Sequence, residues 1–285
     1  MRRTIEVRTC MLLGAVLSCA LQGQSIVPEP SPTCTEMEQF LRTAKIGNMK
    51  DLPRGVTLPK KATLDDGKRK HDASIQTVDI RKSSYQTARG TELNFRDFWG
   101  YNVAGFELAK LLDLNMVPPY VERKTGGRQA SFSWWVDGML EVERMRSKLE
   151  PPDLTSWNRQ MYVIRVFNEL IYNVDANLTN FIVTPDWQLW MIDFSRAFRT
   201  HTTLLNPKNL VQCDRRLLAN LRKLEAKTLE EKLVPPRYLT KMEVEGLLAR
   251  RDRIVEFFDR QIAEKGESAV LFDLPRSGQP CGVGL

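Results

Sequence analysis

The sequence predicts an α+β fold in two lobes, with a strand-rich small lobe over 35–136 and a mainly helical large lobe over 137–271. Short apolar stretches separated by turn signals fill the chain before Asp137-Gly138. After that point, longer stretches carry apolar residues at helical spacing, with one embedded hairpin pattern. Separation of strands from helices along the chain is typical of α+β proteins.

The small lobe is predicted to contain two helices and two hairpins. The first helix follows a capping-box pattern at Thr35-Glu36-Met37-Glu38, and the second is expected over 97–112. One hairpin turns at Asp66-Gly67 and the other around 125–127. Strands are expected over 56–58, 61–64, 73–80, 120–123 and 131–136.

The large lobe is predicted to be built on a long buried helix over 157–172, because apolar residues cover most sides of that segment. Two short strands, 181–184 and 188–192, form a hairpin after it. The other helices are expected over 141–148, 215–224, 241–251 and 254–263, before a flexible tail over 272–285.

The composition is that of a globular protein. Of the 285 residues, 42% are hydrophobic and 27% are charged, which excludes wholesale disorder and a fibrous protein. The net charge of +7 favours an anionic ligand. The basic residues form no stripe with interleaved aromatics, so a nucleic-acid partner is not expected.

The N-terminus has the pattern of a secretory signal peptide over 1–23, followed by a proline-containing linker over 24–34. Its apolar core, 10–21, is too short for a transmembrane span, which needs about 20 residues. A lipoprotein-type site at Cys19 and an uncleaved N-terminus packed on the core are the alternatives. The three cysteines beyond this segment allow at most one disulfide.

A candidate catalytic motif follows the long helix. Asp175 and Asn180 have the spacing Asp-x-x-x-x-Asn, and Asp193 stands at the end of the next hairpin. Phosphoryl transfer needs a carboxylate to position the acceptor hydroxyl and oxygen ligands for Mg²⁺, which this pattern supplies. The same spacing also occurs at 97–102 and 153–158, so the context of the third example carries the interpretation. The alternative is that these side chains only cap turns.

At these residues the sequence resembles the protein-kinase-like superfamily, in its atypical branches: secretory-pathway Golgi kinases, HipA-type kinases and phosphoinositide 3-/4-kinases. The resembling stretches are 172–175, 193–198, the helix and Pro-Pro segment 103–119, and 212–217. The resemblance implies Asp175 as the catalytic aspartate, and Asn180 and Asp193 as ligands of Mg²⁺ or Mn²⁺ bound with ATP. It also implies an inter-lobe hinge at 134–136, where Trp135 would lie near the nucleotide base; core packing is the alternative for the tryptophans.

The sequence departs from the kinase pattern at two charged positions. Gln76 stands where the resemblance places a phosphate-binding lysine, and Asn102 where it places the partner glutamate. The two amides are able to hydrogen-bond each other but carry no charge. Nearby candidates to replace the missing charges are Lys82, Arg89, Arg96 and Glu107. A glycine-rich loop is absent, and Ser195 replaces the glycine expected after Asp193-Phe194.

Two functional hypotheses follow. The first is a metal-dependent phosphotransferase that moves a phosphoryl group from ATP to a hydroxyl of a protein or small molecule. The second is a catalytically silent kinase-fold module, a pseudokinase that binds a nucleotide or partner. The signal peptide implies export as a periplasmic, secreted or lipid-anchored protein, and without it the protein is expected in the cytoplasm. A bacterial periplasm offers little ATP, so in that compartment the silent module or another phosphodonor is expected.

Overall fold

A computed structural model describes residues 31–52, 59–87, 90–275 and 281 of the chain. The fold is that of the unit Pro32–Leu285. The predicted signal peptide and most of the predicted linker lie outside the described residues. Within the described part, no helix is both long and apolar enough to cross a membrane.

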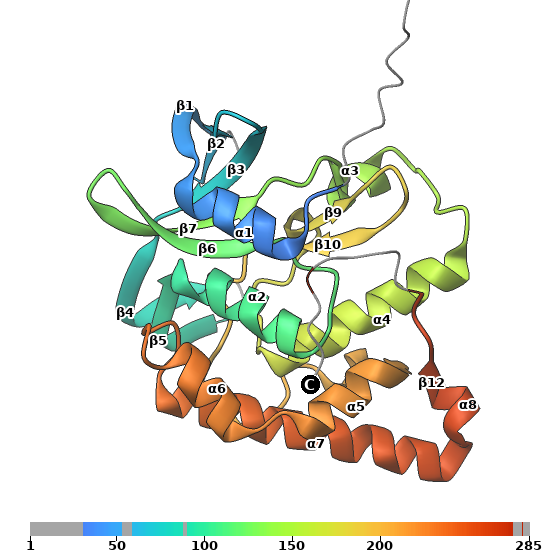
Figure 1. Cartoon of the computed structure of the whole chain (residues 1–285). Coiled ribbons are helices and arrows are strands. Elements are labelled where there is room, and N and C mark those ends of the chain that lie inside the picture. Colours follow the sequence, from blue (N-terminus) through green and yellow to red (C-terminus); the bar gives the residue numbers. More distant parts are fainter. Residues whose placement is uncertain (1–30, 53–58, 88–89, 276–280, 282–285) are drawn as a thin grey trace, which may run out of the picture. The chain divides into compact units, whose positions relative to one another are not determined.

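The first half of the fold is built on a five-stranded antiparallel sheet with the order β1-β2-β3-β7-β6 (Figure 1). Its two predicted hairpins are confirmed, because Asp65 pairs with Lys70 and Thr125 pairs with Arg128 across the turns. The strands are β1 (Lys45–Asp51), β2 (Lys60–Asp65), β3 (Lys70–Gln76), β6 (Tyr120–Thr125) and β7 (Arg128–Trp134).

Helix α1 (Cys34–Thr43) covers one face of this sheet, where apolar side chains alternate along the strands (Figure 1). Its capping box is formed by Thr33 and Glu36, two residues earlier than the sequence pattern predicted. Strand side chains alternate between faces, so Lys61 and Thr63 of β2 and Asp72, Ser74 and Gln76 of β3 lie on the opposite face. The apolar cluster under α1 consists of Phe40, Leu41, Ala44, Ala62, Leu64, Ala73, Ile75, Val121, Ala130 and Phe132.

A separate hairpin, β4 (Asp79–Thr87) and β5 (Gly90–Phe98), connects the sheet to helix α2 (Gly100–Leu111). The sequence analysis extended the helix back to Asp97, which was wrong: Asp97 pairs with Ile80 in β5. Most of β4 is exposed and carries charged and polar side chains, so its sequence lacks the apolar alternation that predicts a strand.

The second half is mainly helical and contains a buried core around α4. Helix α4 begins at Asp153, whose carboxylate accepts the amides of Thr155 and Ser156. The predicted helices 241–251 and 254–263 form one continuous helix, which is a correction to the sequence analysis. The helices are α3 (Glu141–Arg146), α4 (Leu154–Leu170), α5 (Arg215–Lys223), α6 (Ala226–Leu233), α7 (Lys241–Lys265) and α8 (Glu267–Val270).

Short strands in this half join segments that are distant in sequence. The predicted hairpin is present as β9 (Phe181–Val183) and β10 (Leu189–Met191), with β8 (Met139–Leu140) added at its edge. A parallel pair, β11 (Cys213–Asp214) and β12 (Leu271–Phe272), anchors the chain after α8. Two single-turn 3₁₀ helices, η1 (Leu178–Asn180) and η2 (Pro207–Asn209), complete the described elements.

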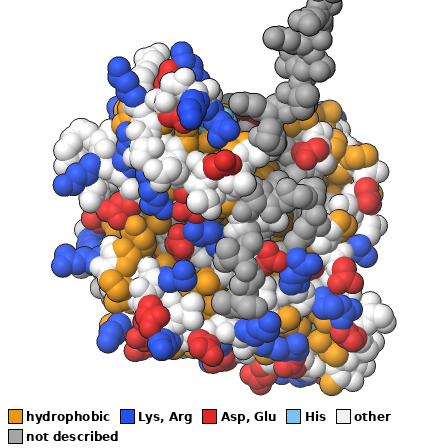
Figure 2. Space-filling model, viewed as in Figure 1, with side chains coloured by type: hydrophobic (Ala, Val, Ile, Leu, Met, Phe, Trp, Pro, Cys, Tyr) orange, Lys and Arg blue, Asp and Glu red, His pale blue; other side chains and the backbone are white. Residues whose placement is uncertain are grey.

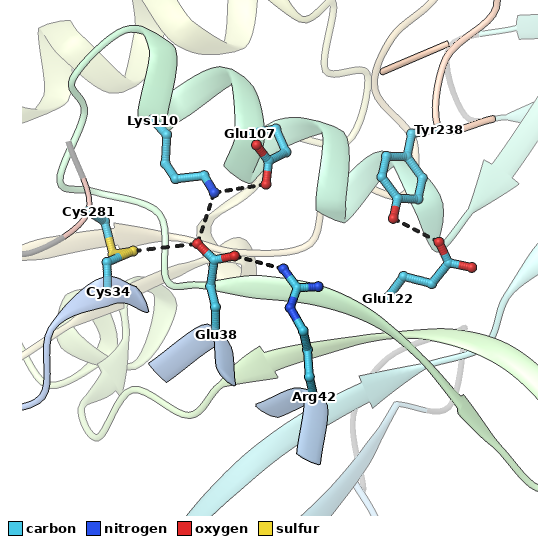
Figure 3. Close-up of polar contacts among 8 residues, drawn as sticks. All are labelled: Cys34, Glu38, Arg42, Glu107, Lys110, Glu122, Tyr238 and Cys281. Atoms are coloured by element: carbon cyan, nitrogen blue, oxygen red, sulfur yellow. Dashed lines mark hydrogen bonds and ion pairs between the residues drawn. A yellow bond between two sulfur atoms is a disulfide. The ribbon is translucent and has the colours of Figure 1, made fainter. Parts of the chain in front are cut away.

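Polar contacts and a disulfide tie α1 to α2 and to the C-terminal end of the chain (Figure 3). Lys110 of α2 makes ion pairs of 2.8 Å with Glu38 of α1 and with Glu107. Cys34 and Cys281 form a disulfide, while Cys213 is free and buried. Part of the expected tail 272–285 lies outside the described residues; within the described part, Phe272 is buried and Cys281 is bonded to Cys34.

Charges of both signs are mixed on the surface. On the face in Figure 2, lysine and arginine side chains lie among aspartates and glutamates. Several surface ion pairs of the protein are largely exposed, such as Lys60–Asp51 and Arg222–Asp259. Exposed pairs of this kind contribute about 0–1 kcal/mol each, so they add little to stability.

We expect loss of the disulfide to destabilise the fold strongly. Cys34 and Cys281 are 247 residues apart, and the chain-entropy model gives a stabilisation on the order of 5 kcal/mol for so long a loop. Cys34→Ser should lower the melting temperature measured by circular dichroism under oxidising conditions. Dithiothreitol should lower it in the wild type but not in the variant. Equal melting temperatures of the oxidised proteins would contradict this.

Candidate functional site

The loop after α4 is shaped by asparagine side chains. The backbone reverses at Tyr172, which has a φ of 50°. Asn173 then donates from Nδ2 to Oδ1 of Asn168 at 2.9 Å and accepts the amide of Asp175 at 3.1 Å. Asn173 is buried, so the backbone of Asp175 is anchored to the end of α4.

Asn180 connects this loop to the strand that leads to Asp193. Its Nδ2 donates to the carbonyl of Asp175 at 2.9 Å, and its own carbonyl accepts the amide of Ile192 at 3.0 Å. The side chain is 8% exposed, which leaves it little freedom. The structure thus brings the three predicted residues, Asp175, Asn180 and Asp193, together around one loop and one hairpin.

Asp193 has a left-handed backbone, with φ at 58°, and a half-buried side chain. Burial raises the pKa of this carboxyl, hydrogen bonds from Ser195 and Gln76 lower it, and the negative charge of Asp175 raises it further. Its amide donates to the hydroxyl of Tyr120 at 3.4 Å. The groups acting most strongly on the Asp193 carboxyl include no cation.

Phe194 fixes the next residue against α2. Its amide donates to Oδ1 of Asn102 at 2.7 Å, and its ring is buried over Gly105. A Cβ atom at position 105 would lie 2.7 Å from Cδ2 of Phe194, so only glycine allows this approach of the helix.

Gln76 and Asn102 form the hydrogen bond that the sequence analysis considered possible. Asn102 is fully buried; its Nδ2 donates to Oε1 of Gln76 and, at 3.2 Å, to the hydroxyl of Ser131. Together with the bond from Phe194, this links β3, β7, α2 and the segment after Asp193. These buried amides have hydrogen-bond partners and carry no charge. The network therefore fixes the positions of these elements but supplies no positive charge for phosphates.

The expected substitutes for the missing charges are engaged elsewhere. Lys82 lies over the ring of Tyr85, and Arg96 lies over Phe98 and forms a 4.0 Å ion pair with Glu243. Glu107 pairs with Lys110, as described above. Arg89 lies outside the described residues. Lys82 and Arg96 also line an open cavity of about 380 Å³ on the β4–β5 hairpin, with Arg81, Ser83, Asn94 and Phe95.

The predicted hinge begins at the end of β7. Trp134 packs on the α1 side of the sheet, stacked on His71 with ring centroids 3.6 Å apart. Trp135 lies beneath Lys61, whose Nζ is 3.9 Å from the ring centroid and 2.9 Å from Asp72. The backbone amide of Trp135 donates to the backbone carbonyl of Asp72, and its carbonyl is hydrogen-bonded to Nε2 of His71. Lys61 is therefore a cation on the polar sheet face that the sequence analysis did not single out.

Asp97 is an acidic residue near the site that the sequence analysis did not single out as functional. It is 6% exposed, its carboxyl is hydrogen-bonded to the Ser195 side chain, and its Oδ1 has no hydrogen-bond partner among the described residues. Burial raises its pKa, and so do the charges of Asp193 and Asp175. Phe95 and Asp97 are two residues apart in β5 and both are buried, and this spacing could have indicated a strand. The sequence analysis instead assigned Asp97 to a helix.

The segment after Asp193 is held by the β4–β5 hairpin. The carboxylate of Glu92 accepts Nη2 of Arg196 at 3.0 Å and Nε of Arg199 at 2.8 Å. The amide of Phe98 donates to the carbonyl of Ser195 at 2.9 Å. Charge-assisted bonds of this kind are stronger than neutral ones, so Ser195 is fixed from both sides.

The donor set fits a divalent cation that is bound together with phosphates. Among the described residues, no three His, Cys, Asp or Glu side chains converge as a metal cluster. Mg²⁺, however, is commonly held by one or two carboxylates plus substrate phosphates. Asp193 and Asn180 offer such oxygen atoms, and the nearby Oδ1 of Asp97 has no hydrogen-bond partner among the described residues.

Comparison with solved structures identifies the fold. The chain is similar to a structure of hydra Fam20 with sugar, at 15% identity and a TM-score of 0.61, covering 84% of this chain and 92% of that one. It is also similar to a crystal structure of the Golgi casein kinase, at 13% identity and a TM-score of 0.57, covering 85% and 79%. No family model and no curated protein sequence matches. The chain thus has a protein-kinase-like fold resembling that of Golgi kinases, which confirms the predicted fold class.

We expect Asn102→Ala to destabilise the protein by about 3 kcal/mol, because it leaves the buried amide of Phe194 and Oε1 of Gln76 without partners, at about 1–3 kcal/mol each. Urea unfolding measures this difference. Asn48→Ala, at an exposed position of β1, is the control and should change stability by less than about 0.5 kcal/mol. Equal effects of the two changes would refute the bridging role of Asn102.

Stability should also depend on pH through His71. Burial lowers the pKa of His71 below its ordinary value of 6.5, so the unfolded chain binds the proton more readily. The stability contributed by neutral His71 is therefore present above pH 6.5 and is lost as the pH falls below it. Urea unfolding from pH 7.5 to 5.5 should show a smaller loss in His71→Gln than in the wild type. Parallel curves would exclude His71 as the source.

Proposed function

We propose that the protein is a metal-dependent phosphotransferase that moves a phosphoryl group from ATP to a hydroxyl of a protein or small molecule. The observation that carries this proposal is the convergence of Asp175, Asn180 and Asp193, linked by the bonds from Asn180 to Asp175 and from Ile192 to Asn180. The protein-kinase-like fold supports it, because that fold hosts phosphoryl transfer at residues of this pattern.

Each residue has a defined part in the proposed reaction. The Asp175 carboxylate orients the acceptor hydroxyl and accepts its proton. The new oxygen–phosphorus bond forms as the bond from the γ-phosphorus to the bridging oxygen breaks, and ADP leaves. Asn180 and Asp193 present oxygen atoms for Mg²⁺ or Mn²⁺ on the phosphates. The bound cation would neutralise charge on the phosphate oxygens. Gln76 acts on the Asp193 carboxyl by hydrogen bonding. We assign Trp135, at the proposed hinge, to contact with the nucleotide base.

A second candidate is a pseudokinase that binds a nucleotide or partner without turnover. The neutral Gln76–Asn102 pair favours it, because a lysine–glutamate pair normally supplies the cationic clamp for the phosphates. The saturated contacts of Asn102 also leave its amide no hydrogen for a ligand. In this case the site would retain nucleotide affinity but lack charge stabilisation in the transition state.

We also propose that the protein acts after export. The Cys34–Cys281 disulfide supports an oxidising compartment, since cytosolic thiols are normally kept reduced. The secretory pattern over 1–23 points the same way. Two of the similar structures are named for Golgi kinases or Fam20, which agrees with a secretory setting.

We expect ATP with Mg²⁺ or Mn²⁺ to raise the melting temperature of the wild-type protein, and ATP alone to raise it less. At 100 times Kd, a ligand that binds only the folded state stabilises it by about 2.7 kcal/mol. Asp193→Ala should abolish the metal-dependent part because it removes a carboxylate ligand. A thermal-shift titration measures both effects, with Asp186→Ala in the β9–β10 turn as the matched control.

Turnover separates the two candidates. The wild type is assayed for release of phosphate from ATP and for its transfer to a hydroxyl acceptor. Activity that is present in the wild type and lost in Asp175→Asn supports the phosphotransferase. Nucleotide binding without turnover supports the pseudokinase, and the double change Gln76→Lys with Asn102→Glu should then raise ATP affinity. No effect of nucleotide under any metal would refute the phosphotransferase and leave only a pseudokinase that binds a partner.

A further inference from the structure

The carboxyl group of Asp97 has a position that the proposed roles leave unexplained. Asp97 lies near the end of β5, three residues before α2, and only 6% of its surface is exposed. Its Oδ1 has no hydrogen-bond partner among the described residues. A buried carboxylate oxygen without a partner is costly, so such an atom in a well-packed fold calls for a ligand or a proton.

Asp97 lies beside Asp193. Hydrogen bonding by the Ser195 side chain lowers the pKa of both carboxyls, and the charge of Asp193 raises the pKa of Asp97, so both carboxyls lie near the same serine. The positions are fixed by backbone bonds: the amide of Ser195 donates to Oδ1 of Asp193 at 3.3 Å, and Phe98 donates to the carbonyl of Ser195. Two acidic side chains are thus held close together within a rigid frame.

The charges around this pair do not balance it. Arg196 is the cation that acts on Asp97, but its guanidinium donates to Glu92, which in turn also binds Arg199. Gln76, which contacts Asp193, is neutral, and Asp175 adds a further negative charge. Oxygen ligands with uncompensated negative charge are what Mg²⁺ and Mn²⁺ prefer.

We propose that Asp97 and Asp193 together hold a divalent cation, Mg²⁺ or Mn²⁺, that binds before the nucleotide. Ser195 and water would complete its coordination. This cation would supply, next to the phosphates, the positive charge that Gln76 and Asn102 do not provide. The inference deepens the proposed function and rests on it for the role of Asp193, and it adds Asp97 as a ligand.

The test is a titration of the full chain with Mn²⁺ in the absence of nucleotide, with free Mn²⁺ measured by electron paramagnetic resonance. Wild-type protein should bind Mn²⁺, and Asp97→Asn should bind it at least about 10-fold more weakly, a loss typical of disturbed metal sites. Asp79→Asn, on the exposed start of β4, is the matched control and should bind like the wild type. Circular dichroism of each variant verifies folding.

Two outcomes overturn the inference: no Mn²⁺ binding by the wild type without nucleotide, or wild-type affinity in Asp97→Asn. In the second case the cation is bound without Asp97. An anomalous diffraction map of Mn²⁺-soaked crystals gives an independent answer, with a peak contacting both Asp97 and Asp193 expected. A peak contacting Asn180 and Asp193 alone would refute the role of Asp97.

The failure of this inference is distinguishable from failure of the proposed function. If ATP with metal stabilises the wild type while Asp97→Asn keeps its Mn²⁺ affinity, the nucleotide site stands and Asp97 is not a ligand. If Mn²⁺ binding depends on Asp97 but ATP has no effect, the cation site stands and the proposed phosphotransfer falls.

Discussion

The side chain of Asn102 joins parts of the fold that are distant in sequence. It is fully buried in α2 and bonds to Gln76 in β3, Ser131 in β7 and the amide of Phe194. The sheet, the helix and the segment that carries Asp193 therefore share one small polar network. In water such amide bonds would be weak, but in a dry interior an unmade bond is expensive, so the network fixes how these elements meet.

The same network determines the charge of the site. A lysine–glutamate pair in place of Gln76 and Asn102 would add one cation and one anion, whereas the amides add neither. The site then has the three carboxyls of Asp97, Asp175 and Asp193, and the nearby cation Arg196 already forms an ion pair with Glu92. The protein as a whole carries +7, but charge far from a buried group is screened by solvent. The charges around these carboxyls therefore favour a cation over an anion.

Sequence reasoning succeeded where local pattern and structure coincide. The turns at 66–67 and 125–127 and the hairpin 181–192 follow from local turn residues and alternation, which the fold retains. The pairing of Gln76 with Asn102 came from the resemblance to kinase-like proteins. It failed at 79–99, because an exposed two-stranded hairpin needs no apolar alternation and its buried end looked like the start of a helix. The Cys34–Cys281 pairing could not be predicted, because no local sequence pattern indicates a contact between residues 247 positions apart.

The missed hairpin is also what makes the site rigid. Glu92 binds Arg196 and Arg199, and Phe98 binds Ser195, so the residues after Asp193 are held before any ligand is present. Kinase-like enzymes that order this segment only on activation must expend binding energy to do so. Here that cost is absent, and the orientation of Asp193 is set by the fold itself. What the site lacks is positive charge rather than order, and a small cation can supply charge without any rearrangement of the chain.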